Sequence, residues 1–73
     1  MQIITNRKGW ITNRLKEPQF IKLDTKEKDF VINVSLSIAG QDKDTNEILL
    51  ELAFLQALLK VAERRINKEV VHS

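Results

Sequence analysis

The chain has 73 residues, a formal net charge of +2, a single histidine and no cysteine. A domain of this size has one small core, and the lack of cysteine excludes disulfides and thiolate metal sites, two of the usual aids to its stability. Association with other chains is the aid that remains. We therefore expect a single domain over residues 1–73 that assembles with copies of itself.

The chain shows no pattern typical of a signal peptide or a membrane span. Residues 1–10 lack an apolar stretch, and the longest apolar run, 48–62, is shorter than the roughly 20 residues that a bilayer requires. We expect a cytoplasmic protein with no membrane partner. Enrichment in Lys, Ile and Asn with few alanines suits an AT-rich bacterial or phage genome, and is compatible with a phage or mobile element as the source.

The N-terminal residues predict a β-hairpin. Residues 2–6 and 10–15 form its two arms, and Gly9 between them provides the positive φ that tight turns require. The sequence Ile-Thr-Asn-Arg occurs once on each arm, at 4–7 and at 11–14. We expect this hairpin to carry the main binding surface.

That surface combines basic groups with an indole ring. Guanidinium groups bind phosphate or carboxylate with two hydrogen bonds, and an indole stacks on a base or fills a pocket of a protein partner. The alternatives are a chance repeat and a tryptophan that belongs to the core. The candidate residues for binding a partner or an anion are Arg7, Lys8, Trp10, Arg14 and Lys16.

The next segments predict two further strands. Residues 30–38 alternate between apolar and polar side chains with a period of two, and Val31 is the single exception. A shorter run at 19–24 precedes them across the polar residues 25–28, so the two runs are expected to pair antiparallel. Residues 1–39 thus predict an antiparallel sheet of three or four strands.

The rest of the chain predicts one long helix over residues 45–69, with a loop at 40–44 and a frayed tail at 70–73. Asp44 and Glu47 are spaced as in a capping box at the start of such a helix. Asp42, Asp44 and Asn46 also have the spacing of the first three ligands of an EF-hand loop. Glu47 stands where that loop needs glycine, so we expect helix capping and no metal.

The fold class is therefore α+β, in the order β-β-β-β-α or β-β-β-α, with the helix packed on one face of the sheet. On a helical wheel, the apolar residues of the helix fall into two stripes about 160° apart. The first, the Ile48 stripe, contains Ile48, Leu52, Leu55, Leu59 and Ile66. The second, the Phe54 stripe, contains Leu50, Phe54, Ala57, Leu58 and Val61.

One stripe packs on the sheet, and the other needs a second cover, for which a helix of another subunit is the simplest choice. We assign the Phe54 stripe to this oligomer interface, although the wheel alone does not distinguish the two. The alternative is a monomer in which residues 1–24 cover the second stripe.

Little in the sequence supports catalysis. The only histidine is His72, and glycines at positions 9 and 40 alone do not allow a GxGxxG or a P-loop motif. We expect no enzyme and no cofactor. The leading hypothesis is a homo-oligomer that binds and modulates another macromolecule, as an inhibitor or adaptor of an unidentified protein.

Two other functions are weighed against this one. The first is binding of nucleic acid, a nucleotide or another phosphate-bearing ligand through the basic hairpin, which would weaken steeply with salt. The second is a structural subunit that assembles through an exposed strand edge and the uncovered helical stripe.

Overall fold

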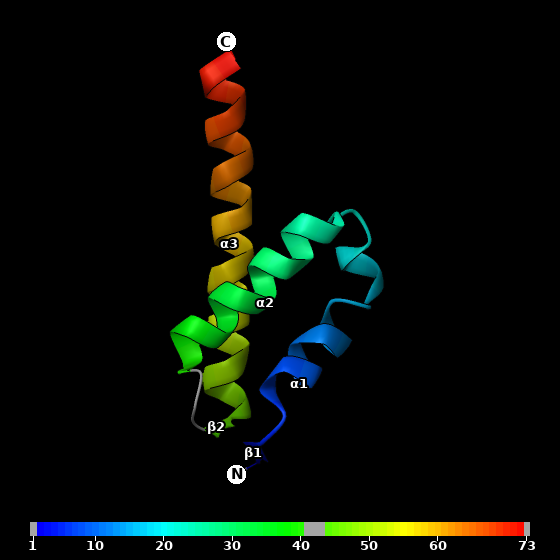
Figure 1. The fold of residues 1–73 in the computed structure, drawn as a ribbon, viewed down its shortest axis with the longest axis vertical. Coiled ribbons are helices and arrows are strands. Elements are labelled where there is room, and N and C mark those ends of the chain that lie inside the picture. The colour runs from blue at the N-terminus through cyan, green and yellow to red at the C-terminus, as the bar shows by residue number, and fades with distance from the viewer. Residues whose placement is uncertain (1, 41–43, 73) are drawn as a thin grey trace.

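The chain is mostly helical, so the predicted α+β fold with a three- or four-stranded antiparallel sheet is wrong (Figure 1). The computed structural model describes residues 2–40 and 44–72, and side chains through Lys68. Within these ranges the strands are β1 (Ile3–Ile4) and β2 (Thr45–Asn46). The helices are α1 (Arg7–Arg14), α2 (Thr25–Ala39) and α3 (Glu47–His72), with a short 3-10 helix, η1 (Pro18–Phe20), between the first two.

The predicted N-terminal hairpin is wrong because residues 7–14 form helix α1. The side chain of Asn6 caps this helix by accepting a hydrogen bond of 3.0 Å from the backbone N–H of Gly9. A Cβ atom on Gly9 would lie 2.5 Å from Asn6 Nδ2. The glycine thus makes room for the cap of a helix and does not form a turn.

The predicted strand at 30–38 lies within α2. A capping box begins the helix: Asp24 accepts from the N–H of Glu27 at 2.8 Å, and Glu27 accepts from the N–H of Asp24 at 3.1 Å. Val31 and Ser35 are four residues apart and fully buried, as one face of a helix requires. Gly40 ends α2 with a φ of 92°. The shorter strand predicted at 19–24 is also wrong, since these residues lie in η1 and the turn before α2.

The β1 and β2 segments form a two-stranded antiparallel ribbon, the one sheet within residues 2–40 and 44–72. Ile3 pairs with Asn46, and Ile4 pairs with Thr45. The N–H of Glu47 also donates to the carbonyl of Gln2 at 3.2 Å. The ribbon therefore ties the N-terminal segment to the start of α3.

The long C-terminal helix is confirmed as α3, with bounds shifted from 45–69 to Glu47–His72. Its cap is Asn46, whose side-chain oxygen accepts from the N–H of Leu49 at 2.8 Å, in place of the predicted Asp44. Residues 41–43, which include the candidate EF-hand ligand Asp42, lie outside the described residues. Ser73 of the predicted frayed tail lies outside them as well, whereas residues 70–72 continue the helix.

The core lies where α1 and α2 pack against the first half of α3, and the second half of α3 extends past α2 (Figure 1). Phe54 is at its centre. The rings of Trp10 and Phe20 meet the Phe54 ring edge-on, with centroids 6.0 and 5.3 Å away. The buried apolar residues around this centre are Ile11, Leu15, Val31, Leu50, Ala57 and Val61.

Candidate interaction surface

The Phe54 stripe is inside the subunit, which corrects its assignment to an oligomer interface. Leu50, Phe54 and Ala57 are fully buried, and Val61 is 5% exposed. Leu58 is partly buried against the same core. The cover comes from α1, η1 and α2, since a mostly helical N-terminal half surrounds this side of α3. The face of α3 that is open to another chain is therefore the opposite one.

The Ile48 stripe is exposed along its whole length. The exposed fractions of its five residues range from 43% to 71%. Ala62, also exposed, completes the row, so that apolar positions alternate at spacings of four and three from Ile48 to Ile66. This is the heptad spacing of helices that pack side by side.

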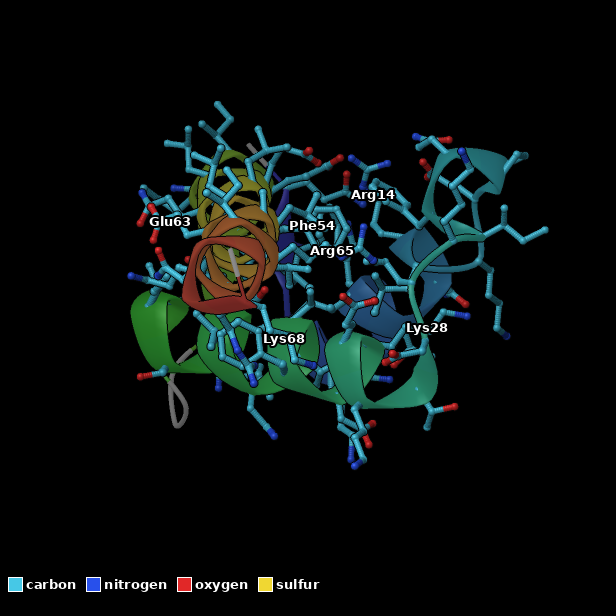
Figure 2. All side chains as sticks on the ribbon, turned by 90° about the horizontal axis from the view of Figure 1, so that it is seen from above. Arg14, Lys28, Phe54, Glu63, Arg65 and Lys68 are labelled. Carbon is cyan, nitrogen blue, oxygen red and sulfur yellow. The ribbon has the colours of Figure 1, made fainter. Side chains whose placement is uncertain are left out.

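The view along α3 shows α2 and α1 covering two sides of the helix, while side chains project freely from the side opposite α2 (Figure 2). Glu63 and Arg65 lie on different sides of α3 in this view. The flank that includes Arg65 also contains Glu51 and Leu58, and the other contains Leu49, Gln56 and Glu63. The exposed apolar row thus has a distinct polar border on each side.

Two ion pairs hold charged side chains of α3 on the flank that includes Arg65. Arg14 donates to Glu51 from Nη2 at 2.7 Å. Arg65 donates to both carboxylate oxygens of Glu27, at 2.6 Å each. The hydrogen bonds from Arg65, followed by that from the Asp24 N–H, lower the pKa of Glu27 to about 2. The two hydrogen bonds to Glu27 keep the Arg65 side chain in place on this flank.

A hollow of about 400 Å³ adjoins the N-terminal end of the Ile48 stripe. Ile48 and Leu52 provide its apolar wall, and the ribbon forms its other side. The remaining lining residues are Gln2, Asn46, Glu47 and Glu51. The stripe thus ends in a depression that an apolar side chain of another molecule can enter.

The residues proposed from the sequence as a basic surface do not gather on one exposed face. Arg7 is 8% exposed, and Lys8 and Lys16 are exposed on α1 or just after it. The Arg14 guanidinium carbon lies 5.1–5.9 Å from the centroids of three aromatic rings, Trp10 among them. Hydrogen bonds to Glu17 and then to Glu51 raise the pKa of Arg14 against the opposing effect of burial. Trp10 itself packs against the core, as the alternative interpretation expected.

A second hollow, of about 360 Å³, separates the start of α2 from the second half of α3. Lys26, Arg64 and Lys68 line it together with Asp24 and the Glu27–Arg65 pair. Arg64 lies 4.4 Å above the Phe30 ring. Because acidic groups share this hollow with the basic ones, it does not have the uniform charge of an anion site. The sequence prediction missed these contacts, although the Asp24–Glu27 spacing could have indicated the start of α2.

Among the residues whose side chains are described, no group of three or more histidines or carboxylates could hold a metal ion. None of the helices in the described part of the chain is long and apolar enough to cross a membrane. Comparison of the sequence and the fold with models of protein families, curated proteins and solved structures found no match.

Proposed function

We propose that this chain is a non-enzymatic interaction protein that acts as a homo-oligomer, with the Ile48 stripe as the contact between subunits. The observation that supports this proposal is the exposed heptad row on α3. A helix with one apolar face in its own core and a second in solvent is typical of a chain that packs against another helix.

The energy available from the stripe is sufficient for reversible association. Five large apolar side chains, each roughly half exposed, would contribute about 1 kcal/mol apiece when covered, or about 10 kcal/mol for two subunits. Association costs about 4–15 kcal/mol in lost freedom of motion. Since gain and cost are of similar size, the assembly is expected to form and dissociate with protein concentration.

In this proposal the oligomer binds and modulates another macromolecule, as an inhibitor or adaptor, through surfaces that the stripe leaves free. Ile21, just after η1, is 79% exposed, and assembly would present it at least twice. The argument for nucleic-acid binding depended on a basic hairpin. Arg7 is buried and Arg14 is paired to carboxylates, so these two arginines do not support that argument.

Light scattering after gel filtration tests the association. At high micromolar concentration we expect a mass of two or more chains of 8.5 kDa, which falls toward one chain on dilution. Leu59→Glu should give one chain at every concentration while far-UV circular dichroism retains the helical signal, because Leu59 lies in the stripe and outside the core.

Asn67→Glu is the matched control, since it adds the same charge to an exposed position of α3 outside the stripe. It should associate like the unmodified chain. A mass of one chain for the unmodified protein at all concentrations would overturn the proposal.

A further inference from the structure

We infer that two copies of the chain pair through α3 in an antiparallel arrangement with one defined register. The inference rests on the proposed function, because it requires the Ile48 stripe to be the contact between subunits. It goes further by specifying which residue of one copy faces which residue of the other.

The first argument is the distribution of side-chain volume along the stripe. In a two-fold antiparallel pair, residues from opposite ends of the stripe face each other, and each contact occurs twice. The small Ala62 then lies opposite Leu52 of the partner subunit. In a parallel pair each residue would face its own copy, and Ala62 against Ala62 would leave a gap in the contact. The antiparallel layers are Ile48 with Ile66, Leu52 with Ala62, and Leu55 with Leu59.

The second argument is the charge on the flank that includes Arg65. The same antiparallel register places Glu51 opposite Arg65 of the partner subunit, and Leu58 opposite its own copy. A parallel pair would place Glu51 opposite Gln56, and Leu58 opposite the carboxylate of Glu63. Flanking charges of this kind determine the orientation of paired helices. On the other flank the antiparallel register places Leu49 opposite Glu63 of the partner subunit, so a Leu–Glu contact occurs in both orientations. The attractive pair of Glu51 with Arg65, which the parallel pair lacks, therefore favours the antiparallel arrangement.

Glu51 and Arg65 can make this contact without losing their partners in their own subunit. Their side chains are 35% and 51% exposed although Glu51 is bonded to Arg14 and Arg65 to Glu27. A carboxylate and a guanidinium each have more than one hydrogen-bonding site, so a further bond across the contact is available to both. The inner ion pairs position the two side chains that would meet.

The third argument is the hollow at the N-terminal end of the stripe. Ile66, at the C-terminal end of the stripe, is 59% exposed. The antiparallel register brings Ile66 of the partner subunit onto Ile48, and so to the apolar wall of this hollow. The same pairing therefore covers both ends of the stripe in each copy.

Cysteine cross-linking tests the register, since the chain has no cysteine of its own. Ile48→Cys and Ile66→Cys are oxidised separately and as an equal mixture. We expect the mixture to give a disulfide-linked dimer between positions 48 and 66, and each variant alone to give at least tenfold less. A mixture of Leu55→Cys and Leu59→Cys tests the central layer in the same way. Asn67→Cys mixed with Ile48→Cys measures the background from random collisions.

Strong cross-linking of Ile48→Cys with itself, or of Ile66→Cys with itself, would show a parallel pair and overturn the inference. Light scattering of the reduced variants separates this failure from that of the proposed function. If the variants dimerise but the mixtures do not cross-link above background, the register alone is wrong. If all variants and the unmodified chain have the mass of one chain, both the antiparallel register and the proposed homo-oligomer are wrong.

Discussion

Phe54 and Leu55 are adjacent in α3, yet the structure predicts different consequences when each is replaced by alanine. Phe54 is fully buried, receives the ring edges of Trp10 and Phe20, and lies beneath the guanidinium of Arg14. Leu55 belongs to the Ile48 stripe and is 43% exposed. The first substitution removes the centre of the core, and the second removes part of an outer surface.

The expected losses in the free energy of unfolding differ by several kcal/mol. Replacing a buried phenylalanine by alanine costs about 3–5 kcal/mol, and each lost edge-to-face contact adds about 0.5–1.5 kcal/mol. A domain of this length is stable by about 4–11 kcal/mol, so Phe54→Ala should remove most of that stability. Leu55→Ala should cost about 1–2 kcal/mol in the single subunit, because nearly half of the leucine side chain is already in water.

Urea unfolding followed by far-UV circular dichroism measures both losses, at a concentration low enough for single subunits. Fluorescence of Trp10, the only tryptophan, gives a second probe that reports the core directly. Leu55→Ala should also weaken association in light scattering. Equal losses for the two variants, or a loss below about 1 kcal/mol for Phe54→Ala, would refute the assignment of the Phe54 stripe to the core.

Two further predictions concern the caps of α2 and α1. The pKa of Glu27 is lowered to about 2 from its ordinary 4.5, so its stabilising contribution is complete above pH 4.5 and is lost as pH falls through about 2. The stability difference between the unmodified chain and Glu27→Gln should therefore be constant near neutral pH and vanish toward pH 2 in urea titrations; a difference independent of pH would contradict this. Replacing glycine by alanine within a helix ordinarily raises the free energy of unfolding by about 1 kcal/mol. Gly9→Ala should not show this increase in urea titrations, because the new Cβ displaces the Asn6 side chain that caps α1. In an Asn6→Ala background the increase should return, and its absence there would refute this role of Gly9.

The sequence predicted α3 correctly and α2 incorrectly, for a reason that lies in residues 30–38. Phe30, Val34 and Ile38 follow one another at intervals of four residues. An interval of four places side chains on one face of a helix, and because it is even it also places them on one face of a strand. The β-branched residues among them favour a strand. The helix instead buries Val31 together with Ser35, which a search for apolar periodicity does not count.

The two stripes of α3 could be located from the sequence, but the stripe that the subunit covers could not be identified. Both stripes contain five apolar residues, so the helical wheel treats them alike. The choice depends on where α1 and η1 pack. The sequence around Gly9 predicts a turn, whereas the structure has the cap of α1 there. The same helix determines where the arginines of the expected basic surface lie, because it buries Arg7 and places Arg14 beside Glu51.

The ribbon between β1 and β2 has a consequence for the order in which the chain folds. It joins segments roughly forty residues apart, and closing so long a loop costs more chain entropy than pairing α2 with α3, which are neighbours in the sequence. Contacts between neighbouring segments form fastest. The helical pair is therefore expected to form first and the N-terminal strand to join last. By the same reasoning this strand is the first part to detach during local unfolding, while α2 and α3 stay together.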